Sequence, residues 1–240
     1  MNGNSNPHSR TVFINGIPVI NNLQNAQQYS VNIDSYETIT QSLYDSATYP
    51  TTGVNQLTYF QNPIGAGTGV ISAAAKTPED TNMQGSGAMP NMQAYVVTSV
   101  ELDVQPDITF TAAQQPAVFG AQAVSASVND VWKVRATGYL NFVIGSKSYL
   151  LEGPLMKFPA SNDLEINAAY SDSTTAGASQ SQRAAYAKAI GPAYVLSPNN
   201  LLLIPMQNFA VTLNWATLET VTSTMRIFCR LMGQLLRASQ

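Results

Sequence analysis

The sequence predicts an all-β protein made of antiparallel strands. Apolar and polar residues alternate over 94–104 and over 206–217, which is the two-residue period of a strand with one buried face. Turn sequences that favour hairpins occur at Asn15-Gly16 and at "GSKS", 145–148. Long stretches with helical periodicity are absent, so a parallel sheet with crossover helices is not expected.

The chain is expected to begin with an N-terminal arm over residues 1–33. Within it, "TVFINGIPVI" (11–20) places Asn15-Gly16 between two runs of β-branched and aromatic residues. This dipeptide favours a type I′ turn, because both central positions require a positive φ. The arm is therefore predicted to carry a hairpin, followed by an amide-rich linker.

Residues 34–45, "DSYETITQSLYD", are the best helix candidate in the first third of the chain. Asp34 and Glu37 have the spacing of a capping box, in which each side chain satisfies a backbone N–H of the first turn. Ile39 and Leu43 form a short apolar stripe four residues apart. The segment is predicted to be a short helix that connects strands.

Two loop regions follow, and neither carries a convincing ligand motif. The first, 49–72, contains "GAGTG" (65–69), but the strand, helix and Lys-Ser/Thr of a phosphate-binding loop do not accompany it. The second, 76–93, contains the adjacent carboxylates Glu79 and Asp80. A calcium loop would need a third oxygen ligand at a set spacing, so these carboxylates are expected to be solvated.

The strand signal becomes strong from residue 94 onwards. The run 127–144 is expected to be one long strand with Lys133 and Arg135 facing outward, and the turn at 145–148 leads into a partner at 149–155. The strand at 94–104 is expected to place Val96, Val100, Leu102 and Val104 on one face and Tyr95, Ser99, Glu101 and Asp103 on the other.

The segment 167–190 begins as a low-complexity run of Ser, Thr, Ala and Gly. It is predicted to be a long surface loop that ends in a short helix around Gln182–Ile190, where Ala and charged residues accumulate. The strand in 206–217 then turns Phe209, Val211, Leu213 and Trp215 inward, which places Trp215 in the core; the location of Trp132 stays open.

The segment "TMRIFCRLMGQLLR" (224–237) fits two structures. Its arginines recur every three or four residues, as in a cationic amphipathic helix, whereas Met225, Ile227, Cys229 and Leu231 recur every second residue. Gly233 would cost a helix about 1 kcal/mol relative to Ala, but in a strand it would mark a bulge or a close backbone approach. We therefore favour a strand, with Cys229 as a buried, inert thiol.

The composition indicates a neutral surface. Charged residues make up 10% of the 240 residues and the net charge is −3, so extensive neutralisation of nucleic-acid phosphates is not expected. A surface of amides and hydroxyls gives little electrostatic repulsion between copies. One cysteine excludes an internal disulfide framework, and we expect a soluble chain without a Sec-type signal or a membrane span.

Little in the sequence predicts catalysis, a metal site or a cofactor. The single histidine, His8, lies in the polar arm, so neither a catalytic triad nor a zinc site is expected. Glu101 and Asp103 are the best carboxylate pair, about 6–7 Å apart on one face of a strand, which overlaps the spacing used in glycoside hydrolysis. Such pairs arise by default on a polar strand face, and the same holds for Asp163 and Glu165.

The chain resembles the jelly-roll major capsid proteins of small tailless bacteriophages. The resemblance spans most of the chain and is carried by the amide-rich arm, "YPTTGVNQLTYFQNPIGAG", "TPEDTNM", "FAVTLNWAT" and "TMRIFCRLMGQLLR". It implies an eight-stranded antiparallel jelly roll with long loops and one or two short helices, or else two small jelly rolls. We favour a single domain over 34–240, with an excursion near 167–190. A basic internal arm, common in coats that grip single-stranded genomes, is missing.

The resemblance implies a capsid subunit that self-assembles into an icosahedral shell of the virion in the host cytoplasm. Its partners would be further copies and other capsid proteins, with weak genome contact; contact with an internal lipid layer stays open. Arg226, Arg230 and Arg237 are the candidates for a subunit interface or for facing the particle interior. The alternative is a carbohydrate- or receptor-binding β-sandwich, and a glycosidase using Glu101 and Asp103 ranks last.

Overall fold

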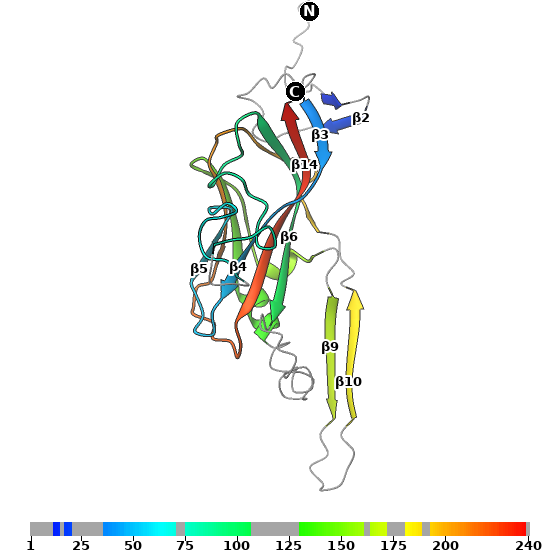
Figure 1. The fold of residues 1–240 in the computed structure, drawn as a ribbon. Coiled ribbons are helices and arrows are strands. Elements are labelled where there is room, and N and C mark those ends of the chain that lie inside the picture. Colours follow the sequence, from blue (N-terminus) through cyan, green and yellow to red (C-terminus); the bar gives the residue numbers. More distant parts are fainter. Residues whose placement is uncertain are drawn as a thin grey trace, which may run out of the picture.

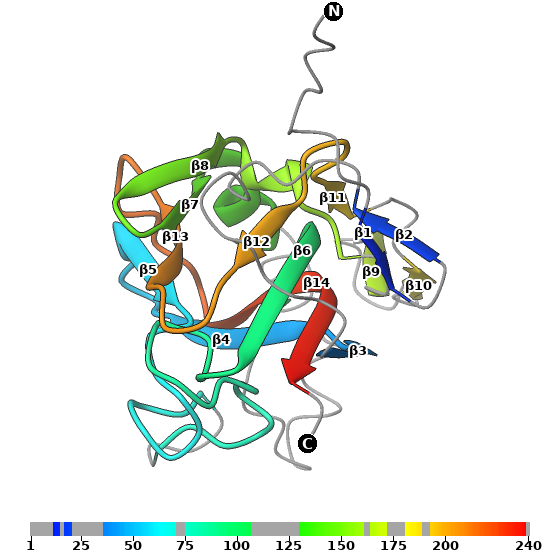
Figure 2. The same ribbon diagram turned by 90° about the horizontal axis from the view of Figure 1, so that it is seen from above.

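The structure is a computed structural model in which two antiparallel sheets pack face to face (Figures 1 and 2). All pairings between its named strands are antiparallel, which confirms the predicted all-β class. The residues that the structure describes are 12–14, 17–20, 36–70, 75–106, 130–160, 164–171, 181–188 and 193–238.

The first sheet is four strands wide and has two long strands at its centre, β6 (Gln93–Pro106) and β14 (Met225–Ala238). The free side of β14 pairs with β3 (Tyr36–Thr40) and then β4 (Leu43–Tyr49). The free side of β6 pairs with β11 (Tyr194–Val195) and β12 (Leu201–Leu203). Two positions of the sheet are therefore each filled by two short strands in succession.

The second sheet has four strands, in the order β5, β13, β7 and β8. The bounds are β5 (Gln56–Tyr59), β13 (Phe209–Asn214), β7 (Tyr139–Ile144) and β8 (Lys147–Glu152). The turn between β7 and β8 contains Gly145 at φ 61°, a conformation that glycine adopts without strain. The hairpin predicted at 145–148 is thus confirmed.

The strands pair in a nested order, in which strands from the two ends of the chain pair with each other and enclose pairs that are closer in sequence. If β3–β4 and β11–β12 each count as one position, the two sheets hold eight positions, four in each. In chain order the first position pairs with the eighth, the second with the seventh, the third with the sixth and the fourth with the fifth. Two further pairings, third with eighth and fourth with seventh, join these pairs into the two sheets.

The core lies between the two sheets and draws aromatic residues from both. Tyr49 and Trp215 meet edge to face with ring centroids 5.0 Å apart, and Phe60 and Phe209 lie 5.6 Å apart. The predicted inward set of β13 is confirmed, since Phe209, Val211, Leu213 and Trp215 are all buried. Cys229 on β14 is fully buried in the same core, also as predicted.

The helix predicted over 34–45 is wrong, because its described part, 36–45, contains β3 and the start of β4. Both strands pair along the same side of β14, with Leu235 opposite Ile39 and Leu231 opposite Leu43. The capping-box pattern is a local signal of about 1 kcal/mol. Strands here instead satisfy backbone hydrogen bonds along most of the outer edge of β14, over 225–231 and 234–238.

The single strand predicted over 127–144 is also wrong in its first part. Residues 130–137 form a helix, and β7 begins only at Tyr139. Asp130 and Val134, four residues apart, are the buried positions of this helix, while Lys133 pairs with Glu219 at 3.1 Å. The four-residue spacing of these buried positions is that of a helix with one buried side.

Two hairpins lie outside the sheets. The hairpin predicted within 11–20 is confirmed by the pairing of β1 (Val12–Ile14) with β2 (Ile17–Ile20). The helix predicted around 182–190 is wrong, because β10 (Ser181–Lys188) pairs in register with β9 (Leu164–Ser171). This second hairpin extends away from the sheets as a two-stranded ribbon (Figure 1).

A bulge corrects the faces predicted for 94–104. Met232 lies opposite Ser99 and Gly233 opposite Val97, so Thr98 is an extra residue in β6. Tyr95 and Val97 therefore join Val100, Leu102 and Val104 in the main core. Ala94 and Val96 lie on the opposite face, in a smaller cluster with Leu202, Ile204 and Leu236. The periodicity was correct on each side of the bulge, and its phase changed at Thr98.

Candidate functional site

The strand prediction for 224–237 is confirmed by β14, whose Arg226 and Arg230 lie on the sheet face that points away from the main core. Met225, Ile227, Cys229 and Leu231 face that core, so the residues between them face outward. The outward residues sit beside polar residues of both neighbouring strands: Arg226 beside Thr48 and Gln105, Phe228 beside Ser46 and Asp103, and Arg230 beside Tyr44 and Glu101. We refer to Arg226, Phe228 and Arg230 as the arginine face.

Arg226 is held inside the chain by Asp80. Its Nη2 lies 3.2 Å from Asp80 Oδ1, and both side chains are buried. The Asp80 carboxylate also accepts hydrogen bonds from the backbone N–H groups of Thr77 and Val70. Burial alone would raise the pKa of Asp80, but these two hydrogen bonds and the charge of Arg226 outweigh it and lower that pKa.

Arg230 shares the face with a buried carboxylate and an aromatic ring. Its Nη2 donates to Asp103 Oδ2 at 2.9 Å. The guanidinium carbons of Arg226 and Arg230 lie 4.0 and 5.1 Å from the centroid of the Phe228 ring, so the ring contacts both cations. Among the described residues, Asp103 Oδ1 and Arg226 Nε have no hydrogen-bond partner.

The three arginines that the sequence singled out differ in availability. Arg237 pairs with Glu37 at 2.7 Å, and both side chains are 52% exposed. The side chain of Arg230 is 28% exposed and that of Arg226 only 10%. Each of these three arginines forms an ion pair with a carboxylate from another part of the chain, so its positive charge is neutralised locally. Arg230 and Arg237 remain accessible, whereas Arg226 has a structural role.

The carboxylates considered for catalysis are not solvated. Glu101 and Asp103 are 3% and 5% exposed and lie on the arginine face of the sheet. Asp80 is 1% exposed, which corrects the expectation that it would be a solvated loop residue. His8 and Asp163 lie outside the described residues. Within the described part of the chain, no three His, Cys, Asp or Glu residues are close enough to hold a metal ion.

The outer face of the second sheet contains no Asp, Glu, Lys or Arg. The buried residues of β13 and β7 alternate with half-buried or exposed ones, and the pairing brings the latter together on one face. Ser148 Oγ donates to Asn141 Oδ1 at 2.5 Å, so polar groups on this face bond to one another. We call this surface the neutral face; it consists of Gln56, Thr58, Tyr139, Asn141, Val143, Ser148, Leu151, Ala210, Thr212 and Asn214.

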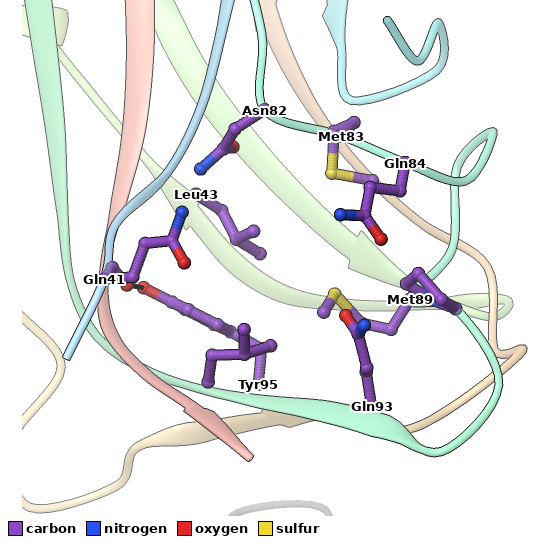
Figure 3. Close-up of a pocket in the computed structure, with 10 residues that line it drawn as sticks. Gln41, Leu43, Asn82, Met83, Gln84, Met89, Gln93 and Tyr95 are labelled. Atoms are coloured by element: carbon purple, nitrogen blue, oxygen red, sulfur yellow. Dashed lines mark hydrogen bonds between the residues drawn. The ribbon is translucent and has the colours of Figure 1, made fainter. Parts of the chain in front are cut away.

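A small cavity lies at one end of the sandwich, between the start of β4, the start of β6 and the loop before β6 (Figure 3). Its volume is about 50 Å³, and its lining includes the amides of Gln41, Asn82, Gln84 and Gln93. Tyr95 closes one side, where its hydroxyl lies within hydrogen-bond distance of the carbonyl oxygens of Gln41 and Leu231 and can donate its proton to either. Ligand pockets usually have roughly 300–1,000 Å³, so this cavity has room for little more than water.

Sequence reasoning missed a second charged cluster, Asp45 with Lys76. Lys76 Nζ lies 2.5 Å from Asp45 Oδ1, and the two side chains are 7% and 1% exposed. The other carboxylate oxygen accepts a hydrogen bond from the Phe60 N–H at 2.6 Å. No sequence signal joins residues 45 and 76, because the contact depends on how the loop after β5 folds back along β4.

The described part of the chain contains no helix long and apolar enough to cross a membrane. No protein-family model matches the chain, and no curated protein and no solved structure matches it either.

Proposed function

We propose that this chain is a structural subunit of a viral capsid, built on a single jelly roll, that self-assembles with further copies of itself into a closed shell. The nested strand order supports the jelly-roll part. A double-sheet jelly roll has eight strands in two Greek keys, which gives the order 1-8-3-6 in one sheet and 2-7-4-5 in the other. The order found in the two sheets is the same.

The neutral face is the observation that carries the assembly part. Charged residues are depleted at the centres of protein interfaces, because each buried charge loses its hydration. A four-stranded sheet face with ten outward residues and no charged side chain therefore suits a contact between copies. Tyr139 and Leu151, 43% and 66% exposed, would supply apolar contact area there.

Two further surfaces support a multi-copy assembly. The β9–β10 ribbon extends from the sandwich, and its strands pair with each other. An isolated two-stranded hairpin is marginally stable in water, so a neighbouring copy would stabilise it. At another place Met92 and Met206, 59% and 71% exposed, lie on two loops joined by the Met206 N–H and the Met89 carbonyl. Exposed methionines are common at adaptable binding surfaces.

In this proposal the arginines of β14 contribute little to binding the genome. Arg226, Arg230 and Arg237 are each neutralised by a carboxylate, so they add little net positive charge for phosphates. Arg230 and Arg237 stay accessible enough to bind a carbonyl or carboxylate of another copy or of another capsid protein. The proposed location is the shell of the virion, after assembly in the host cytoplasm.

A carbohydrate- or receptor-binding module is the second candidate, because lectin domains share the double-sheet architecture. The observation in its favour is Tyr139, an exposed aromatic ring beside Asn141 and Asn214 on the neutral face. A ring flanked by amides can stack on a sugar and bond to its hydroxyls. Such a module would act as a stable monomer or small oligomer rather than as a shell.

A charge placed on the neutral face tests the proposal. Thr58→Lys adds a cation to an exposed position of this face, and Thr52→Lys adds the same cation to an exposed position in the turn after β4, which is not part of the face. Electron microscopy of both variants should show particles for Thr52→Lys and mostly unassembled subunits for Thr58→Lys. Particles formed equally well by both variants would show that the neutral face is not an assembly contact. Glycan-array binding by an unassembled wild type would favour the second candidate.

A further inference from the structure

The Asp45–Lys76 pair has the arrangement of a site for amide formation. The amine nitrogen and the carboxylate oxygen lie 2.5 Å apart, closer than the roughly 2.7–2.9 Å usual for a charged hydrogen bond. Both side chains are more than nine-tenths buried. Groups held in contact in this way react with effective concentrations far above those reached in solution. The pair is thus positioned for reaction as well as for attraction.

The surroundings disfavour the charged form of Asp45. Cys229 lies opposite Asp45 in the pairing of β4 with β14, and both Cys229 and the nearby strand residue Tyr59 are fully buried. The Tyr59 hydroxyl has no hydrogen-bond partner among the described residues. Burial raises the pKa of Asp45 even though Lys76 acts in the opposite direction. Burying two charges costs free energy that a neutral amide would not cost.

The second carboxylate oxygen has a donor suited to the reaction. Asp45 Oδ2 accepts the backbone N–H of Phe60 at 2.6 Å, and Phe60 is held at a positive φ of 68°. A non-glycine residue in this conformation is strained, so the surrounding fold must hold the N–H in place. A fixed N–H that points at a carboxyl oxygen stabilises the negative charge that develops there during acyl transfer.

We propose that Lys76 and Asp45 condense into an intramolecular amide, making these residues a self-modification site. A proton first moves from the Lys76 ammonium to Asp45 Oδ1, which gives an amine and a carboxylic acid. The Nζ lone pair then attacks Asp45 Cγ, and the charge develops on Oδ2 beside the Phe60 N–H. A second proton passes from Nζ to Oδ1, the Cγ–Oδ1 bond breaks and one water leaves. No oxidant, reductant or cofactor takes part.

The bond would fasten the loop after β5 to β4. Lys76 Nζ also donates to the Ser46 carbonyl at 2.9 Å, and Asp45 forms an isolated bridge with Thr81, so this loop already lies along the strand. A covalent link between residues 45 and 76 would close a ring of chain that spans both sheets through β5. Like a disulfide, it would restrict the unfolded state, but reductants would not cleave it.

The intact mass of the purified wild-type protein tests this proposal. We expect a mass lower than the sequence mass by one water, and a branched peptide containing residues 45 and 76 after proteolysis. Lys76→Arg keeps the cation but removes the reactive amine, so its mass should equal its own sequence mass. A folded wild type at full sequence mass overturns the proposal, and so does a water loss that persists in Lys76→Arg or maps elsewhere. The wild-type measurement decides the question even if the variant does not fold.

Discussion

At Gly233 the backbones of β6 and β14 approach so closely that a Cβ atom would lie 1.8 Å from the Val96 carbonyl oxygen. The bulge at Thr98 creates this approach, because it draws one residue of β6 out of the regular ladder. The obstacle is backbone rather than the end of a flexible side chain, so it cannot move aside locally. Any side chain at position 233 must therefore push the two central strands of the first sheet apart.

Gly233→Ala is accordingly expected to lower the free energy of unfolding by about 3 kcal/mol or more. Gly65→Ala is the matched control. Its φ is +84° and no atom lies within 4 Å of the added Cβ, so the cost should be about 1–2 kcal/mol from backbone strain alone. Denaturant unfolding of both variants checks this. Equal losses would show that the close approach at Gly233 is absent.

The charge of Asp80 contributes to the stability of the fold, and this contribution should depend on pH. Its pKa is lowered in the folded protein, so the stability it contributes is fully present above the unfolded value, near pH 4. That stability is lost as the pH falls through the lower, folded value. In molecules where Asp45 is still a free carboxyl, the wild-type curve also includes this group, whose pKa is raised by burial, so a single curve does not isolate Asp80.

Asp80→Asn should therefore be less stable than the wild type by about 2 kcal/mol at pH 7, because a charged acceptor of several hydrogen bonds is lost. The difference should shrink as the pH falls from about 4, where the carboxyl is protonated first in the unfolded chain, through the lower pKa that Asp80 has in the folded protein. Thermal unfolding of the two proteins between pH 2 and pH 7 measures it. A difference that stays constant over this range would contradict the assignment.

Single residues were predictable where their surroundings are local in sequence. Trp215 and Cys229 lie in regular alternating runs, and both are in the core as expected. Asp45 and Asp80 were not predictable, because what makes their burial tolerable is Lys76 and Arg226, which are distant in sequence. Buried charges of this kind become visible only when the tertiary contacts are known.

Among the elements, the helix over 130–137 contacts the residue that follows β13. This residue, Trp215, donates its indole N–H to the Val134 carbonyl at 3.0 Å. The same ring contacts Tyr49 from the first sheet. Trp132 lies on the helix itself but is 60% exposed. Of the two tryptophans, Trp215 therefore packs in the core, whereas Trp132 faces solvent.

Trp215→Ala is expected to lower the free energy of unfolding by about 3–5 kcal/mol, since it removes a buried ring and the partner of the Val134 carbonyl. Trp132→Ala should change it by no more than about 0.5 kcal/mol. Chemical denaturation followed by far-UV circular dichroism compares the two. A large loss with Trp132→Ala would mean that this side chain packs against something.

Element prediction succeeded where alternation was long and failed where a neighbour decided the structure. β6, β13 and β14 follow from their periodicity, and Gly233 correctly marked a close approach in a strand. β3 and β4 form because β14 needs hydrogen-bond partners along its edge, which a capping-box pattern does not reveal. The bulge at Thr98 changes the phase of β6 although no Gly or Pro lies near it in β6, whose one proline is its last residue, Pro106.

At the scale of the whole molecule, the β9–β10 ribbon has, among the described residues, no strand pairing with the two sheets of the sandwich. The ribbon strands pair with each other, while the eight positions of the sandwich form both sheets without them. In the proposed shell the ribbon contacts a neighbouring copy, so its loss should affect assembly more than folding. The sequence indicated an excursion here, but the low-complexity composition did not reveal the paired strands.

Replacing residues 164–188 by a short Gly-Ser linker should therefore leave the unfolding temperature within a few degrees of the wild type, because the core between the sheets is retained. Assembly of this variant should be lost or strongly weakened, since one contact repeated by symmetry acts at every subunit. Calorimetry and electron microscopy give the two readouts. A variant that unfolds far earlier would show that the ribbon belongs to the folding unit.

The molar mass of the purified wild-type chain, measured by light scattering after size-exclusion chromatography and imaged by electron microscopy, tests the central claim most directly. A neutral face, an extended ribbon and a nested two-sheet scaffold predict closed particles or stable rings of many copies. A strict monomer over the whole accessible concentration range, with no particles in the images, would contradict the assembly proposal.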